Sequence, residues 1–237
     1  MEYSALLAGR RSTRRFDTAR DVPDDVLEQV LAAPLAMPHA GNTYDWRGVV
    51  LRRRDRDAAT WPAVHAALLG QSYVEEAAVV VAFAVQPGWW AERYRANIAA
   101  LVDRGLIDPA RHAGLLAMVD AGPGDSDFLT TGLIGEAMMG VAAAMLAALD
   151  AGLGATVTAC RPAELAAAIG LPDGAVLCPW GVLAIGWPAA DDEPPAAGGS
   201  QPEEAGAGRP PAAAPKPGLD EMYFGRRWGQ SLATPVL

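Results

Sequence analysis

A cluster of arginines near the N-terminus is the first candidate for chemistry in this sequence. Four arginines fall within the six positions 10–15, with a serine and a threonine between them. A guanidinium offers a planar pair of donors that matches phosphate oxygens, and neighbouring hydroxyls add neutral donors. The segment therefore predicts a site for one phosphate group, although a solvated basic turn would have the same composition. The residues assigned to this site are Arg10, Arg11, Ser12 and Arg14.

A second candidate is segment 38–46, with the sequence PHAGNTYDW, in which a rigid proline and small residues precede a polar amide and an indole. Small side chains let the backbone approach a flat ligand closely. Asn42 can both donate and accept hydrogen bonds, which suits the edge of a uracil-like ring. An ordinary turn between a helix and a strand is the alternative that composition alone leaves open.

Helices and strands must position these two segments, and the hydrophobic pattern predicts where they lie. Periodicity and capping signals predict helices over 3–9, 24–33, 63–69 and 127–151, with a shorter helix beginning near Arg161. Apolar runs predict strands over 47–53, 77–84, 155–158 and 182–187, of which 77–84 is the expected central strand. The charged run 52–57 is expected to be a solvated turn.

Charge and composition exclude several classes of protein. The chain carries a formal net charge of -9, whereas nucleic-acid binders generally display a basic footprint, so we expect no nucleic-acid partner. Two cysteines without metal-ligand spacing indicate neither a disulfide scaffold nor a metal site and favour a cytoplasmic location. The apolar stretch 132–148 contains Glu136 and precedes Asp150, which favours a buried helix over a membrane span.

The length of 237 residues is sufficient for one substantial core. We predict a catalytic domain over 1–188, with a helical insertion at about 89–120 that could form a lid. Segment 189–215 is rich in Pro, Ala, Gly and Glu and is expected to be a flexible excursion without a core. Large apolar side chains return within 216–237, which is expected to complete the domain or to embrace a second subunit.

Several motifs together carry a resemblance to a known family. RRSTRRF at 10–16 and PHAGN at 38–42, followed by Trp46, resemble the paired N-terminal motifs of nitroreductase-family flavoproteins in residues and in spacing. GLGAT at 152–156 and VLAIGWP at 182–188 continue the resemblance in the order typical of that family. The similarity spans nearly the whole chain, apart from segments 89–120 and 189–215.

The resemblance implies an α+β fold of the nitroreductase type, in which a central mixed β-sheet is flanked by helices in an intertwined homodimer. One flavin mononucleotide (FMN) would occupy each of two clefts at the subunit interface. The arginine and serine side chains named above would hold the phosphate and ribityl groups together with Lys216, and backbone amides at 158–160 would face the reactive ring. The other implied flavin contacts are Pro38, His39, Ala40 and Asn42 from the partner chain, Gln71 at the pyrimidine edge, and Thr158, Ala159 and Cys160.

The implied activity is that of an FMN-dependent oxidoreductase. Hydride would pass from NADH or NADPH through flavin N5 to a small organic acceptor, such as a nitroaromatic or a quinone, by a ping-pong mechanism. No protein nucleophile is required, so no catalytic side chain is assigned. Departures from the family pattern at His39, Asp45 and Ala159 favour an alternative, a flavin-dependent dehydrogenase or oxidase that desaturates a small metabolite or peptide. A flavin-binding protein without turnover is the third possibility.

Overall fold

The computed structural model of this chain describes residues 2–122 and 126–190. Its four strands are β1 (Trp46–Arg52), β2 (Val79–Val85), β3 (Gly154–Thr158) and β4 (Val176–Gly186), which form one sheet in the order β1-β2-β4-β3. All three pairings are antiparallel. The prediction of a mixed sheet is therefore wrong for the described part of the chain, because the strands alternate in direction across the sheet.

Eight α-helices accompany the sheet within the described residues. They are α1 (Tyr3–Gly9), α2 (Asp24–Ala32), α3 (Trp61–Ala67), α4 (Ser72–Glu76), α5 (Trp90–Asp103), α6 (Pro109–Asp120), α7 (Ser126–Asp150) and α8 (Pro162–Ala168). The helices predicted at 3–9, 24–33, 63–69 and 127–151 are confirmed to within a few residues. The last strand is longer than predicted, and its register against β2 shifts between Ala82 and Ala84. Strand β4 extends beyond this irregularity back to Val176, so the apolar pattern at 182–187 predicted only about half of the strand.

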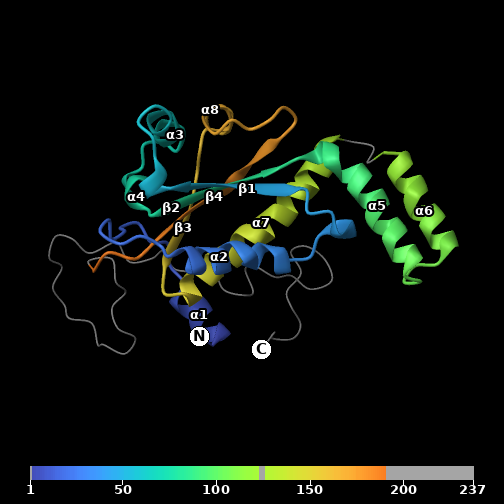
Figure 1. Cartoon of the computed structure of the whole chain (residues 1–237), viewed down its shortest axis with the longest axis horizontal. Coiled ribbons are helices and arrows are strands. Elements are labelled where there is room, and N and C mark those ends of the chain that lie inside the picture. The colour runs from blue at the N-terminus through green and yellow to red at the C-terminus, as the bar shows by residue number, and fades with distance from the viewer. Residues whose placement is uncertain (1, 123–125, 191–237) are drawn as a thin grey trace, which may run out of the picture. The chain divides into compact units, whose positions relative to one another are not determined.

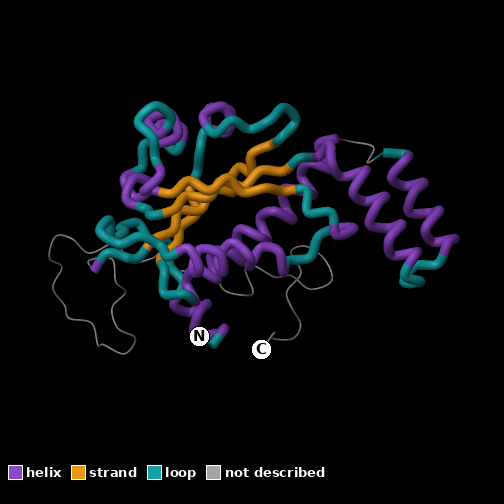
Figure 2. The backbone as a smooth tube through the Cα atoms, in the orientation of Figure 1, coloured by secondary structure: helices purple, strands orange, loops and turns teal. Residues whose placement is uncertain are grey.

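Strand β2 separates two apolar layers, as expected for a central strand. Every residue from Val79 to Val85 is buried. Because alternate side chains of a strand point to opposite faces, the odd-numbered residues pack toward α2 and α7, whereas the even-numbered ones pack toward α3 and α8. Figure 1 shows α2 and α7 on one face of the sheet and α3 and α8 on the other, and Figure 2 shows the same layers as a tube.

Helix α7 is buried along one stripe. Leu133, Ala137 and Val141 lie on the side that packs in the core, whereas Phe128 and Met139 are exposed. The prediction of a buried helix is thus correct for one side of it. Length and composition alone would allow α7 to cross a membrane, a weak criterion that core helices of soluble proteins also meet.

The predicted helical insertion contains helices α5 and α6, which lie side by side at one end of the sheet (Figure 1). Tyr94, Ile98 and Val119 form a small buried cluster between them. Its function as a lid stays a prediction.

Candidate functional site

The arginine segment lies against the first residues of β3. The backbone N–H of Thr13 donates to the carbonyl oxygen of Ala155 at 3.2 Å, and the N–H of Asp17 donates to the carbonyl oxygen of Trp187 at 2.9 Å. The side chain of Thr13 is buried against Gly154. These contacts fix segment 13–17 at the end of the sheet where β3 begins and β4 ends.

Glu76, the last residue of α4, holds the other side of this segment. Its Oε2 accepts a hydrogen bond from the N–H of Phe16 at 2.9 Å, and its Oε1 lies 3.5 Å from Nε of Arg15. This ion pair accounts for Arg15, which the sequence left out of the phosphate set.

The remaining donors of the segment are available to a ligand. Within the described residues, no hydrogen bond or ion pair engages the side chains of Arg10, Ser12 or Arg14. Arg11 is not counted with them because it already takes part in an interaction. Two guanidinium groups and a hydroxyl therefore stand near the start of β3, which is the donor set that a phosphate monoester requires.

A second group of donors lies at the other end of β3. Thr158 is buried, while the next two residues, Ala159 and Cys160, are half-buried. In the part of the chain that the structure describes, no hydrogen bond engages the backbone N–H of Ala159 or of Cys160, whereas the N–H of Arg161 donates to the carbonyl oxygen of Ala67 at 2.8 Å. Because folded chains pair most of their buried N–H groups, two adjacent free donors indicate a place for an acceptor.

Strand β3 sets the distance between the two groups. At about 3.3 Å per residue, the step from Gly154 to Thr158 covers roughly 13 Å. Cationic donors at one end and backbone donors at the other suit a ligand that carries an anionic group on a chain and an acceptor-rich ring beyond it.

Gln71 lies beside Thr158, but its amide is already in use. Its Nε2 donates to Oγ1 of Thr158 at 2.6 Å and to the carbonyl oxygen of Leu68 at 3.2 Å, and its Oε1 accepts from the hydroxyl of Tyr73. Both amide hydrogens are thereby engaged within the chain. The predicted contact of Gln71 with a ring edge would require these bonds to break. Sequence reasoning missed Tyr73, whose position two residues after Gln71 on a short helix is not a distinctive pattern.

Loop 38–46 is held by the helical insertion and by α7. Asn97 of α5 donates to the carbonyl oxygens of Gly41 and Asn42, both at 2.8 Å, and the N–H of Ala40 donates to Oε1 of Glu136 at 2.9 Å. Gly41 adopts a left-handed φ of 61°. Pro38 and Asn42 are exposed, and no hydrogen bond in the described range engages the side-chain amide of Asn42. This amide remains available to a ligand.

The His39 ring binds within its own chain. Its Nδ1 lies 2.8 Å from the carbonyl oxygen of Met37, and its Nε2 lies 2.7 Å from Nε1 of Trp46. A carbonyl only accepts and an indole N–H only donates, so this arrangement holds a neutral imidazole with its proton on Nδ1. The imidazole therefore shapes the loop through both ring nitrogens, and the contact of His39 with a flavin stays a prediction.

Asp45 is buried at the end of the same loop. Neither carboxylate oxygen makes a hydrogen bond, and the nearest cation is Nη1 of Arg93, at 3.5 Å from Oδ1. Burial raises the pKa of the Asp45 carboxyl, against the opposing effects of the Thr43 hydroxyl and of Arg93. Arg93 also donates to the carbonyl oxygen of Tyr44 at 2.9 Å. Asp45 and Arg93 thus connect the loop to α5.

Within one chain, loop 38–46 and the arginine segment are anchored at different places along α7. Ala40 is bound to Glu136, whereas Thr13 lies against β3, which follows the end of α7 at Asp150. At 1.5 Å per residue, the part of α7 between these two places is about 21 Å long. Lys216, the remaining predicted phosphate ligand, lies outside the described residues.

Comparison with known proteins places the chain in a family. The model described as "Nitroreductase family" matches residues 7–187. The chain belongs to the nitroreductase family. A Thermus thermophilus protein named NADH dehydrogenase is 44% identical over 72 residues, which cover 30% of this chain and 33% of that protein. The match thus spans about a third of the length of this curated relative.

Solved structures establish the nitroreductase-like fold. A candidate nitroreductase from Exiguobacterium sibiricum, in complex with FMN, has a TM-score of 0.66 at 18% identity and covers 82% of this chain and 91% of its own. A candidate NAD(P)H:FMN oxidoreductase from Staphylococcus epidermidis has a TM-score of 0.67 at 16% identity, with 82% and 90% covered.

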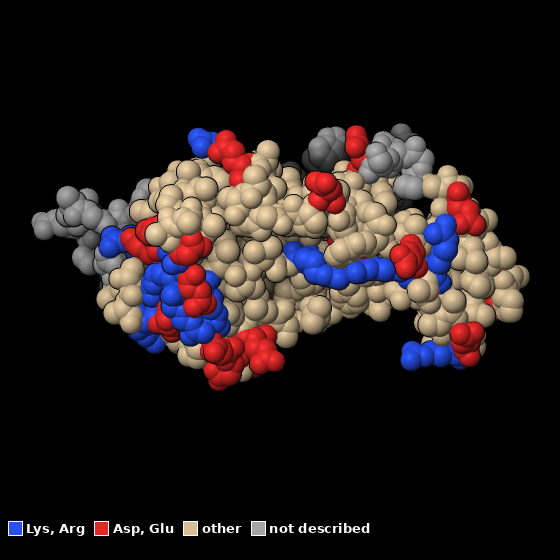
Figure 3. All heavy atoms as spheres, turned by 45° about the horizontal axis from the view of Figure 1, so that its top comes forward, with Lys and Arg blue, Asp and Glu red and all other residues tan. Residues whose placement is uncertain are grey.

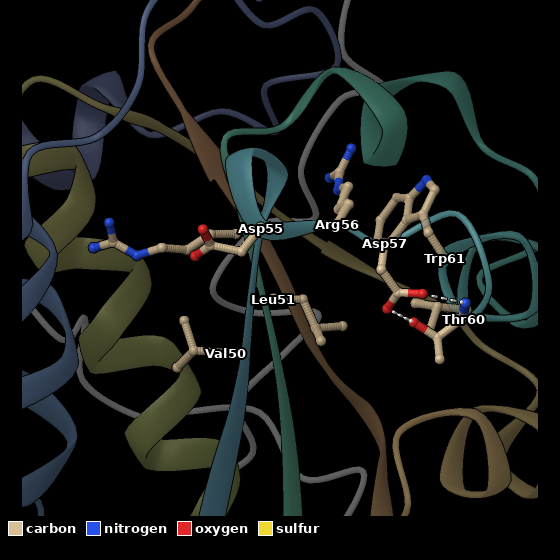
Figure 4. Close-up of a pocket in the computed structure, with 9 residues that line it drawn as sticks. Val50, Leu51, Asp55, Arg56, Asp57, Thr60 and Trp61 are labelled. Carbon is tan, nitrogen blue, oxygen red and sulfur yellow. Dashed lines mark hydrogen bonds between the residues drawn. The ribbon is translucent and has the colours of Figure 1, made fainter.

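An open hollow of about 140 Å³ lies elsewhere in this nitroreductase-family chain, beside edge strand β1 (Figure 4). Its lining includes Leu51, Arg56, Thr60 and Trp61, and none of the residues that the sequence assigned to flavin. Charged side chains gather around this end of β1 (Figure 3), where Arg52 and Arg54 both pair with Asp24. The hollow therefore does not coincide with the candidate site.

Arg56 corrects the prediction of a solvated turn at 52–57. Its side chain is 8% exposed, and its guanidinium lies 3.5 Å from the centroid of the Trp61 ring. It donates to the carbonyl oxygens of Glu75, Val74 and Ala77. Burial lowers the pKa of Arg56 to about 10, so it remains charged at neutral pH. The indole covers one residue of a turn whose sequence looks fully solvated.

Proposed function

We propose that this protein is an FMN-dependent oxidoreductase that passes hydride from NADH or NADPH to a small organic acceptor. The observation that carries the proposal is strand β3, with free cationic and hydroxyl donors beside its first residues and free backbone donors beyond its last. FMN has the matching layout, since its phosphate is separated from its ring by a ribityl chain. The residues present therefore fit the cofactor.

In this proposal Arg10, Ser12 and Arg14 hold the phosphate, and the N–H groups of Ala159 and Cys160 bind the ring. FMN, when bound, supplies the two-electron redox chemistry. The chain supplies position, charge compensation and hydrogen bonds, so no side chain needs to act as a nucleophile. Arg10 and Arg14 offset the charge of a phosphate in a protein that is acidic overall.

A second copy of the chain would complete the site. Ala40, in the loop with Pro38 and Asn42, is bound about 21 Å along α7 from the helix end beside the arginine segment, so we infer that the loop serves the site of another chain. Helix α7, which binds the loop through Glu136, leaves an apolar face exposed at Phe128 and Met139. Exposed apolar side chains on one helix can pack against another protein. We therefore propose an intertwined homodimer in which each cleft draws on both subunits.

The proposed chemistry is supported by what the structural relatives bind. The Exiguobacterium protein was solved with FMN, and the Staphylococcus protein is described as an NAD(P)H:FMN oxidoreductase. The desaturating dehydrogenase loses part of its support, because His39 and Asp45 make contacts within their own chain. Of the three departures that favoured it, Ala159 alone lies at the proposed ring site.

The first test is the absorbance spectrum of the purified protein, before and after anaerobic addition of NADH or NADPH. Flavin bands that bleach at once would support the oxidoreductase. Bands that persist would favour a dehydrogenase reduced by its own substrate. A protein that is colourless after addition of FMN and removal of the unbound flavin would overturn the proposal.

Substitution of Arg14 tests the phosphate site directly. Loss of a charge-assisted hydrogen bond costs about 1.5–3 kcal/mol, so Arg14→Ala should weaken FMN binding roughly 10- to 150-fold. Arg104→Ala, at an exposed arginine that follows α5, is the matched control and should leave the dissociation constant unchanged. Equal affinities of the two variants would remove Arg14 from the site. Riboflavin, which lacks the phosphate, should bind Arg14→Ala and the unaltered protein alike.

A further inference from the structure

Three side chains at the end of β3 form a compact polar cluster. Oγ1 of Thr158 lies 2.6 Å from Nε2 of Gln71 and 2.8 Å from the hydroxyl oxygen of Tyr73, and that hydroxyl also contacts Oε1 of Gln71. Thr158 is buried, and the other two residues are half-buried. The cluster joins the start of α4 to the last residue of β3.

Proton counting fixes the direction of each bond in this cluster. Oε1 of Gln71 can only accept, so Tyr73 must donate its single proton there. The contact between Tyr73 and Thr158 must then be donated by Thr158, while Oγ1 of Thr158 accepts from Nε2 of Gln71. The three residues form a closed ring in which each group both donates and accepts.

The Thr158 proton has a second possible acceptor. Oγ1 of Thr158 lies 3.2 Å from the carbonyl oxygen of Ala159, a longer contact than the 2.8 Å to Tyr73. The proton can form a strong hydrogen bond with only one of these acceptors at a time. Tyr73 therefore competes with the Ala159 carbonyl for it, and removing the phenol hydroxyl would turn the proton toward Ala159.

The Ala159 carbonyl belongs to the same planar peptide unit as the N–H of Cys160. A shorter and stronger hydrogen bond from Thr158 to this carbonyl would rotate the whole unit and change the direction of the N–H. That N–H has no partner within the described residues and is one of the two backbone donors proposed to bind the flavin ring. The other end of the turn is fixed by the bond from Arg161 to Ala67, so the rotation would concentrate at residues 159 and 160.

We propose that Tyr73 is a positioning residue, which engages the Thr158 hydroxyl and thereby holds the Ala159–Cys160 peptide unit in the direction that serves the flavin ring. This inference rests on the proposed function. It assigns Gln71 to the ring of hydrogen bonds, in place of a direct contact with the cofactor.

A double-mutant cycle with Tyr73→Phe and Thr158→Val tests the proposal. Each variant should still bind FMN, because the phosphate donors are untouched. Tyr73→Phe should shift the visible absorption bands of the bound flavin and slow its reduction by NADH or NADPH by about tenfold, the effect of one lost hydrogen bond. Thr158→Val leaves no hydroxyl to bond the Ala159 carbonyl, so it should stay close to the unaltered protein in both readouts. Since Tyr73 acts through Thr158, the double variant should behave like Thr158→Val alone.

Two further variants serve as controls for this test. Thr158→Ser retains a hydroxyl, so Tyr73→Phe should keep its full effect in that background, whereas Tyr3→Phe, at an exposed tyrosine, should change neither the spectrum nor the rate. Additive effects of the two substitutions would overturn the inference, and so would an unchanged spectrum and rate in Tyr73→Phe. Failure of the unaltered protein to bind FMN would instead overturn the proposed function. Unfolding curves of each variant distinguish a loss of folding from a displaced Ala159–Cys160 peptide unit. A Tyr73→Phe variant that folds but does not bind FMN would also contradict the inference.

Discussion

Gly154 and Thr13 lie so close together that a methyl group on Gly154 would fall 2.6 Å from the side chain of Thr13. The backbone of Gly154 is not in the left-handed region, so this is a constraint of space alone. The contact determines how the arginine segment lies on β3.

Gly154→Ala should therefore displace the segment and weaken FMN binding. Overpacking of a buried contact costs about 1–3 kcal/mol, and we expect a loss of that size in the free energy of unfolding, measured with urea. Gly114→Ala is the control, since a Cβ at that helical position meets nothing within 4 Å. Unchanged stability and FMN affinity in Gly154→Ala would mean that the segment can move without consequence.

Gly41→Ala should loosen the loop from the helical insertion. Gly41 has a φ of 61°, and a Cβ there would lie 2.3 Å from the ring of Tyr94. Gly105 has a similar φ of 68° but open space around it. Gly105→Ala should cost about 1 kcal/mol of backbone strain, and Gly41→Ala about 1–3 kcal/mol more because of the clash. Thermal unfolding of both variants measures the difference, and equal costs would contradict the packing of Gly41 on Tyr94.

Replacing Asp45 by Asn should make the free energy of unfolding less dependent on pH. Burial raises the native pKa of Asp45 above its ordinary value of 3.8, so the native state binds this proton more tightly than the unfolded state does. The contribution of Asp45 to stability is therefore lost as pH rises from 3.8 through the native pKa. Asp45→Asn should gain stability relative to the unaltered protein as pH rises from 4 to 8, in urea unfolding at each pH.

The exposed Asp103→Asn provides the comparison for Asp45, because its stability difference should stay small over the same range. If the unaltered protein instead gained stability relative to Asp45→Asn with rising pH, the attraction between Asp45 and Arg93 would outweigh the cost of burial.

The two cysteines should differ in reactivity toward iodoacetamide. Burial raises the pKa of the Cys178 thiol to about 12 and also raises that of Cys160, and the thiolate is the reactive form. At pH 8 we expect Cys178 to react after unfolding, and Cys160, which is half-buried, to react slowly in the native state. FMN should slow the labelling of Cys160 further and leave Cys178 unchanged, as mass spectrometry of the adducts would show. Equal labelling of Cys160 with and without FMN would place the ring elsewhere.

The sequence predicted the elements of the fold well because their signals are local. The run 77–84 is apolar and rich in β-branched residues, and it became the fully buried β2. Direction within the sheet is not a local property, so the mixed sheet was taken from the family resemblance, and the strands are antiparallel in the described residues. The prediction that 52–57 is a solvated turn failed for a similar reason. Trp61, which covers Arg56, lies outside that run in the sequence.

The candidate site was predictable in its residue types and less so in its contacts. Composition marked the basic segment that holds Arg14 and Ser12, because it stands out in an acidic chain, and its assignment to a phosphate stays a prediction. The engagement of Gln71 by Tyr73 and Thr158 depends on two segments separated by more than eighty positions. The contacts of the His39 ring with Met37 and Trp46 likewise could not be predicted, because they depend on the geometry of one turn.

The distance between Ala40 and the arginine segment has a consequence for how the protein behaves when it is diluted. When two molecules together build a ligand site, ligand binding and their association are linked, so in the proposed homodimer FMN and a second subunit should stabilise one another by mass action. FMN would dissociate from such a protein on dilution before the chain unfolds. Occupancy by the cofactor would then report protein concentration as much as cofactor supply.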